Sequence, residues 1–225
     1  NSTHCMLDLW YSLESQPQLK EKLFQNISLD FIFMLNPDGS KVWSRRNSLD
    51  IDMNRDYLQN ASCEMKLLKE VAFSKKYDYA LNLHEQRTIF STDGKNPATL
   101  SFLAPSEEVS RAITKGRIQT MNVIVAMNEL LQQIIPNFIG RYTDEFYPTA
   151  TGDNFQKLGY NTILIESGHF PEDYSREFSR EFTFYAILQG LFHIATNTEF
   201  NSYQSYFEIP NNKQMFFDVI HRNTT

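Results

Sequence analysis

The sequence predicts an α/β fold with a mixed, partly parallel central sheet and helices on both faces. Short apolar runs of strand length alternate along the chain with longer stretches whose apolar residues recur every three or four positions. Runs such as LDFIFML and NTILI are apolar on both sides, which is typical of central strands covered by helices on each face. Strands that alternate with helices favour a sheet with parallel members.

The expected elements follow from these patterns in chain order. Apolar positions at helical spacing predict helices at residues 5–24, 62–75, 107–133 and 175–196. Apolar runs bounded by turn formers predict strands at residues 29–35, 77–83, 99–103 and 161–165. A Pro-Asp-Gly turn ends the first strand. The tail at residues 203–223 is a candidate edge strand, and the turn-rich, aromatic stretch at residues 144–155 is expected to be a loop.

Length and charge narrow the protein class. The 225 residues contain no repeat or flexible linker, so we expect one domain over residues 1–225. A net charge of −6 with scattered Lys and Arg excludes a nucleic-acid surface, and no apolar run approaches the roughly 20 residues of a membrane span.

The sequence leaves the oligomeric state open. It also leaves the localisation open, and a secreted or periplasmic protein is favoured. Cys5 and Cys63 are expected as free buried thiols, with a disulfide or one thiol of each environment as alternatives.

Two residues at strand ends are candidates for chemistry. His84 follows the predicted strand YALNL, and Glu166 ends the predicted strand ILIE. Active sites of open α/β sheets lie at the carboxyl ends of strands. A neutral imidazole there can bind zinc, and a carboxylate at the mouth of an apolar strand is desolvated, which raises its pKa toward that of a general base.

Two short arginine-containing motifs supply candidate anion-binding groups. WSRRN contains Arg45 and Arg46, and DMNRD contains Asn54 and Arg55. A planar guanidinium group is the best available fork for a carboxylate.

Five motifs in order resemble the zinc carboxypeptidase family. They are Asn-Pro-Asp-Gly at residues 36–39, an arginine before a short loop, Asp-x-Asn-Arg, Leu-His after a strand, and a late strand-end Glu. The resemblance runs through most of the chain. The family's HxxE zinc pair, expected just before the first helix, is not in this sequence. We therefore expect residue 1 to fall about two positions after the Glu of that pair, in a domain truncated at its N-terminus.

The resemblance implies a role for each candidate. His84 would be the third protein ligand of one zinc ion, whose site is incomplete in this chain. Glu166 would move a proton from water to the leaving amine, and Arg46 would stabilise the oxyanion, with its neighbour Arg45 as the alternative. Asn54 and Arg55 would bind the terminal carboxylate of the substrate. Tyr147 would close over the substrate, with Tyr142 as its rival.

The function that we expect is zinc-dependent hydrolysis of the C-terminal peptide bond, by a metallocarboxypeptidase whose partner is a peptide with a free C-terminal carboxylate. Two alternatives stay open. One is an N-acyl-amino-acid deacylase of the aspartoacylase and succinylglutamate desuccinylase type. The other is a zinc-free binding protein that keeps the carboxylate grip without hydrolysis.

Overall fold

The computed structural model describes residues 2–197 and 199–219. Its helices are α1 (Ser2–Ser15), α2 (Pro17–Phe24), α3 (Pro37–Val42), α4 (Cys63–Ser74), α5 (Lys115–Ile134), α6 (Thr151–Lys157) and α7 (Glu177–Thr196), with short 3-10 helices η1 (Met53–Arg55) and η2 (Tyr203–Glu208). Its strands are β1 (Tyr79–Glu85), β2 (Phe90–Ser91), β3 (Leu100–Leu103), β4 (Ile139–Arg141), β5 (Asn161–Ser167) and β6 (Lys213–Gln214). None of the described helices is long and apolar enough to cross a membrane.

The central sheet has four strands in the order β1-β5-β3-β4. β1 runs parallel to β5 and β3 runs parallel to β4, whereas β5 and β3 are antiparallel. The predicted mixed, partly parallel sheet is therefore confirmed. β2 and β6 form a separate antiparallel pair.

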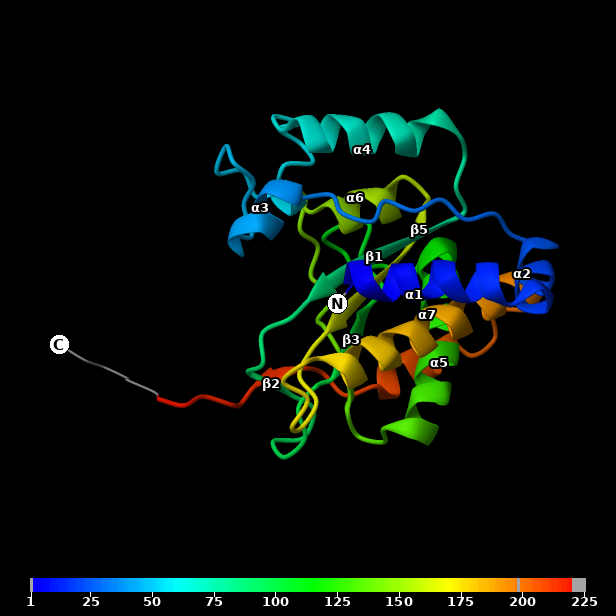
Figure 1. The fold of residues 1–225 in the computed structure, drawn as a ribbon, viewed down its shortest axis with the longest axis vertical. Coiled ribbons are helices and arrows are strands. Elements are labelled where there is room, and N and C mark those ends of the chain that lie inside the picture. The colour runs from blue at the N-terminus through cyan, green and yellow to red at the C-terminus, as the bar shows by residue number, and fades with distance from the viewer. Residues whose placement is uncertain (1, 198, 220–225) are drawn as a thin grey trace.

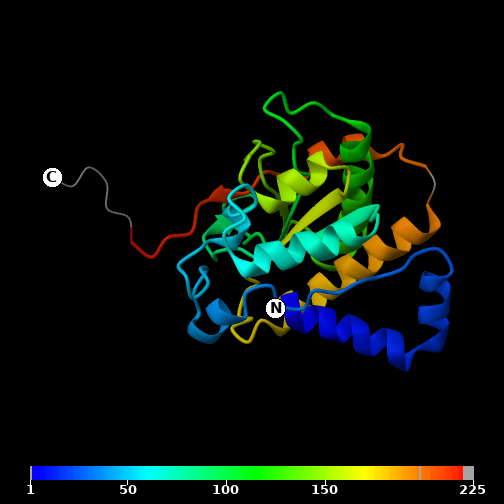
Figure 2. The same cartoon turned by 90° about the horizontal axis from the view of Figure 1, so that it is seen from above.

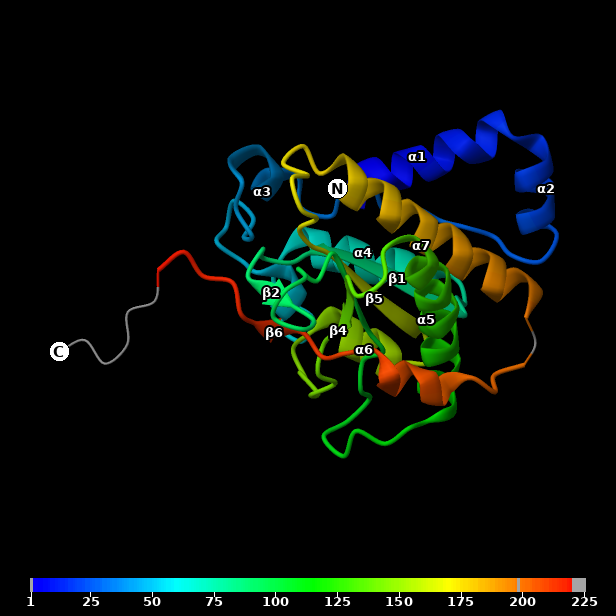
Figure 3. The same cartoon turned by 90° about the horizontal axis from the view of Figure 1, so that it is seen from below.

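Helices cover both faces of this sheet, as predicted. In Figure 1, α4 and α6 lie above the strands, α5 and α7 extend below them, and α1 crosses the view at the height of the strands. Seen from below in Figure 3, α5 and α7 cross in front of the sheet. The main core fills this lower side, where Ile163 and Ile165 of β5 are buried against apolar residues such as Met127 and Leu191.

The N-terminal helix expected at residues 5–24 is two helices. α1 ends at Ser15, and Pro17 occupies the first turn of α2. Proline lacks the amide N–H that a continuous helix needs and clashes with the preceding turn, so it restarts a helix more readily than it extends one.

Two other boundaries also differ from the prediction. The helix expected from residue 107 begins only at Lys115, where the Thr114 side chain accepts a hydrogen bond from Arg117 N. α6 starts inside the stretch expected to be a loop, at Thr151.

Both cysteines are free thiols, and Cys5 is buried whereas Cys63 is exposed. This matches the alternative of one thiol in each environment and not the favoured expectation of two buried thiols.

The strand expected at residues 29–35 is wrong. These residues run beside the domain without joining either sheet. Burial nevertheless alternates along them, with Phe31 and Phe33 partly buried and Ile32 and Met34 exposed, as in a strand. A strand needs a neighbour to pair with, and apolar sequence alone does not provide one.

The tail departs from a simple edge strand. It begins with η2, and the strand in its described part, β6, pairs with β2 and not with the central sheet. Residues 220–223 of the expected strand lie outside the described residues.

Candidate active site

The carboxyl ends of β1 and β5 bring His84 and Glu166 side by side. The parallel register pairs the two residues directly, so their side chains leave the sheet on the same face. This is the face that carries α6, because Gly152 of α6 lies against the side chains of Asn82 and Thr162, which share the parity of His84 and Glu166. Both strands extend past the predicted ends, so His84 and Glu166 lie within the ladder.

Glu166 is a partly buried residue whose carboxyl group has one buried oxygen without a partner. Its Oε2 atom is buried and makes no hydrogen bond within the described part of the chain. Burial raises the pKa of Glu166 to about 7, Arg45 opposes that shift, and Glu85 adds to it. A carboxyl group with this pKa exchanges protons near neutral pH, which is the property required of a general base.

His84 is held in its neutral form. Burial lowers the pKa of His84 to about 4, Arg45 and Arg55 lower it further, and Asp52 opposes them. At neutral pH the imidazole therefore carries a free nitrogen lone pair, which can accept a hydrogen bond or bind a metal ion.

The adjacent residues Arg45 and Arg46 pair with different carboxylates, and this pairing sets their positions relative to His84 and Glu166. Arg45 Nε lies 2.7 Å from Asp52 Oδ2, and Arg45 acts on the pKa values of both His84 and Glu166. Arg46 turns to the neighbouring loop, where its Nη1 donates to Asp50 O at 2.6 Å and its Nε lies 3.7 Å from Asp50 Oδ1. The structure thus places Arg45 beside the pair and Arg46 outside it.

The loop around η1 is built to hold Arg45 and Asn54 in fixed positions. Asn36 caps α3 by accepting from Gly39 N, and its Nδ2 donates to Arg45 O at 3.2 Å. Asp52 caps η1 by accepting from Asn54 N at 3.1 Å. Asn36 therefore acts as a cap that also fixes the site loop.

Asn54, Arg55 and Tyr147 come together from segments far apart in sequence. Asn54 Oδ1 accepts from Thr151 N at 3.2 Å, which joins η1 to the start of α6. The Arg55 guanidinium carbon lies 5.3 Å from the centroid of the Tyr147 ring. Tyr147 N donates to Asp153 Oδ1 at 2.9 Å, and Tyr147 itself is about half exposed. An exposed guanidinium beside a phenol forms a subsite suited to a carboxylate.

The rival tyrosine lies at the other end of the site. Tyr142 OH donates to Gln86 Oε1 at 2.7 Å, and burial together with the Glu166 charge raises the pKa of Tyr142. Tyr142 is therefore the tyrosine near Glu166, and Tyr147 is the one near Arg55. Gln86 and Asp52 were missed by sequence reasoning, although Asp52 immediately precedes the basic Met-Asn-Arg turn and its capping role could have been read there.

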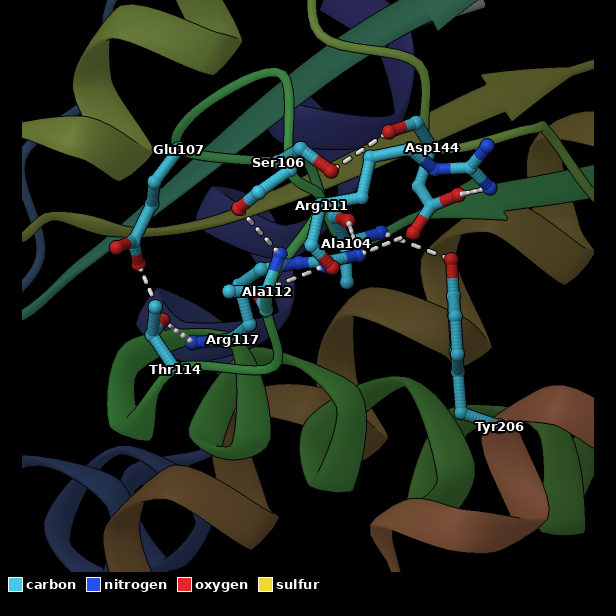
Figure 4. Close-up of polar contacts among 10 residues, drawn as sticks. Ala104, Ser106, Glu107, Arg111, Ala112, Thr114, Arg117, Asp144 and Tyr206 are labelled. Atoms are coloured by element: carbon cyan, nitrogen blue, oxygen red, sulfur yellow. Dashed lines mark hydrogen bonds and ion pairs between the residues drawn. The ribbon is translucent and has the colours of Figure 1, made fainter.

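A second buried carboxylate, Asp144, lies in the same segment between β4 and α6 as Tyr147, and both of its oxygens are paired. Asp144 Oδ2 accepts from Arg117 Nη2 at 2.7 Å, and Asp144 Oδ1 pairs with Arg111 (Figure 4). Burial favours a higher pKa, but the hydrogen bonds from Arg117 and Arg111 outweigh it and hold the pKa of Asp144 below its ordinary value. Ser106 Oγ donates to Asp144 O at 2.6 Å, so the loop before α5 and the loop before α6 are tied together.

The described residues do not complete a zinc site. They contain no group of three or more His, Cys, Asp or Glu side chains placed to hold a metal ion. His84 is suited to serve as one ligand, but catalytic zinc sites use about three protein ligands. Zinc binding would therefore require ligands in addition to those described.

No family model and no curated protein matches this sequence at a significant level. Solved structures do match its fold. A metallo-carboxypeptidase from Burkholderia cenocepacia matches with a TM-score of 0.52 and 16% identity, over 72% of this chain and 43% of that chain. A protein from Shewanella denitrificans, described provisionally as a metallopeptidase, matches with a TM-score of 0.52 and 19% identity, over 78% of this chain and 64% of that chain. This chain spans less than two thirds of either structure, and it has the α/β fold that metallocarboxypeptidase structures share.

Proposed function

We propose that this chain belongs to a zinc-dependent metallocarboxypeptidase that hydrolyses the C-terminal peptide bond of peptides. The observation that carries the proposal is the pairing of His84 and Glu166 in register at the strand ends, one held neutral and the other buried with a pKa of about 7. The fold shared with metallopeptidases supports the same reaction class.

Each residue of the proposed site has one task. Arg55, Asn54 and Tyr147 bind and orient the terminal carboxylate. Arg45 takes the oxyanion role expected of Arg46, because its charge acts on the pKa values of both His84 and Glu166. Glu166 accepts a proton from the attacking water at its unpaired Oε2 and delivers it to the leaving amine as the peptide C–N bond breaks. Zinc, when bound, lowers the pKa of water and polarises carbonyl groups, and His84 would be one of its ligands.

The carboxylate subsite can be tested in the full-length protein with zinc supplied. Arg55→Ala is expected to lower kcat/KM on peptides with a free C-terminus, because a charge-assisted hydrogen bond contributes on the order of 1.5 to 3 kcal/mol. C-terminally amidated peptides should be poor substrates for the parent enzyme and nearly unaffected by the change. Equal losses on free and amidated peptides would show that Arg55 supports the fold and does not bind the carboxylate.

The same protein separates the alternatives. Turnover of N-acyl-amino acids with no peptide hydrolysis would favour the deacylase. Binding of carboxylate products with no turnover of either substrate would favour the zinc-free binding protein. Glu166→Gln should lower peptide turnover by roughly a hundredfold or more while product binding persists, since only the positioned base is lost.

A further inference from the structure

One edge of the central sheet is unpaired at β1. Among the described residues, β1 is the terminal strand of the sheet and pairs with β5 alone. Gln86 N donates to Ser167 O and Asp78 O accepts from Asn161 N, so even-numbered residues here direct their backbone groups to β5. Backbone groups alternate in direction along a strand of a parallel pair, and those of Tyr79, Leu81 and Leu83 therefore point away from β5. An exposed run of such groups is a template for another strand.

The extended segment at residues 28–36 lies opposite this edge. No backbone–backbone hydrogen bond joins its residues 28–35 to other described residues. Phe31 and Phe33 pack on Trp10 of α1, with ring centroids 5.8 and 6.4 Å apart. Within the described part of the chain, its backbone from residue 28 to 35 takes part in one hydrogen bond, which Thr3 Oγ1 donates to Phe33 O at 2.6 Å. The segment is thus held mainly by its side chains, and Phe33 O is the one backbone group of residues 28–35 with a hydrogen bond to the described residues.

A cavity of about 630 Å³ fills the space between this segment and β1. Helices close it on the other two sides: Leu68 and Val71 come from α4, Leu9 from α1 and Leu191 from α7. Figures 1 and 2 show the segment passing between α4 and α1 on its way from α2 to α3. A slot with extended backbone at its two edges and apolar helices above and below has the surroundings of a strand inside a sheet.

The directions of the surrounding elements define how a strand would enter. In Figure 1 the arrowhead of β1 lies beside the start of α1, and α1 runs back toward α2. Ser2 and Thr3 line the cavity at that end, together with His84. A strand that continues directly into α1 must finish there, and it would run parallel to β1 and to residues 28–36. Strand, α1 and residues 28–36 would then make a β-α-β unit.

We propose that this slot receives a further β-strand, an extended polypeptide segment that leads directly into α1 and pairs with β1 on one side and with residues 28–36 on the other. Its side chains would be apolar on both faces, because α4 covers one face and α1 and α7 cover the other. The 43% and 64% of the two solved chains that this chain covers leave room for such a segment. The inference rests on packing and does not depend on the proposed hydrolysis.

Hydrogen exchange in the full-length gene product and in the 225-residue chain tests the strand directly. In the full-length protein, the amides of Leu81, Leu83 and residues 29–35 should exchange at least roughly tenfold more slowly than in the 225-residue chain. Equal exchange in the two proteins, or a gene product with no residues ahead of Asn1, would overturn the proposal. Protection that depends on protein concentration would also overturn it, by assigning the slot to a second copy.

A pair of substitutions on α4 gives a second test. Leu68→Trp enlarges a side chain that lines the slot, whereas Leu67→Trp is the matched control on the exposed side of the same helix. With the strand in place, Leu68→Trp should overpack the slot and lower Tm by roughly 2 to 8 °C. In the 225-residue chain the larger side chain should leave Tm unchanged or raise it, and Leu67→Trp should act alike in both proteins. An equal effect of Leu68→Trp on both proteins would contradict the proposal.

Discussion

Burial raises the pKa of both Asp144 and Glu166, but the charged partners of the two carboxyl groups differ. Asp144 has two guanidinium partners, and its pKa lies below the ordinary value. Glu166 has an unpaired buried oxygen, and its pKa is raised to about 7. Burial acts on both groups in the same direction, and the two guanidinium partners of Asp144 reverse its effect there.

The contrast separates a structural role from a functional one. A paired carboxylate keeps its charge at all working pH values and serves to tie loops together, as Asp144 ties the segment before α5 to the segment before α6. An unpaired carboxyl group costs stability but can gain and lose a proton near neutral pH. Glu166 is therefore assigned to the proposed active site, and Asp144 is a structural residue that holds the neighbouring loops together.

Removing a partner from the paired carboxylate should have the largest effect on stability. Arg117→Met leaves the Asp144 charge buried with only the half-exposed Arg111 beside it. We expect a loss of about 3 to 5 kcal/mol in the free energy of unfolding, measured by urea denaturation. Arg111→Met removes the more exposed partner and should cost about 1 kcal/mol or less. Similar losses from both substitutions would show that Arg117 has no special part in holding Asp144.

Neutralising the unpaired carboxyl group should have the opposite sign. The pKa of Glu166 is about 7 in the folded chain against an ordinary 4.5, so the folded state holds the proton more tightly and stability falls as pH rises from 4.5 through 7. Glu166→Gln removes this loss. It should stabilise the chain by up to about 3 kcal/mol at pH 8 and leave stability nearly unchanged at pH 4.

Urea denaturation at the two pH values checks this prediction, with Glu70→Gln on the exposed surface of α4 as the control. The control should stay within about 0.5 kcal/mol of the parent protein at both pH values. A Glu166→Gln variant that is less stable than the parent at pH 8 would mean that the ionised carboxylate is satisfied in the folded protein.

The smallest expected effect distinguishes the adjacent arginines. Arg45 lowers the pKa of His84, so Arg45→Gln should raise the His84 pKa from about 4 toward its ordinary value, as followed by NMR titration of the imidazole protons. The change should be partial, since burial is the larger cause. Arg46→Gln should leave the pKa of His84 unchanged, because Arg46 pairs with Asp50. The reverse result would return the site position to Arg46.

Periodicity and strand ends could be predicted from sequence because they depend on local pattern. The apolar runs before His84 and Glu166 became paired neighbours in one sheet. The choice between Arg45 and Arg46 could not be predicted, since it depends on which loop carboxylate each one meets. The Arg117 and Asp144 pair joins residues from a helix and a distant loop, with no local signal of their contact. Residues 29–35 have a strand's pattern, but the strand also requires a partner that periodicity does not supply.

A direct titration of the two carboxyl groups tests the central claim, and carbon NMR of the side-chain carboxyl atoms is the measurement. The account predicts that Glu166 ionises at a pH of about 7, while Asp144 ionises below the ordinary value of 3.8. Substituting each residue by its amide assigns its signal. A Glu166 carboxyl group that ionises near its ordinary 4.5 would contradict the account, because it would then share the behaviour of a structural carboxylate.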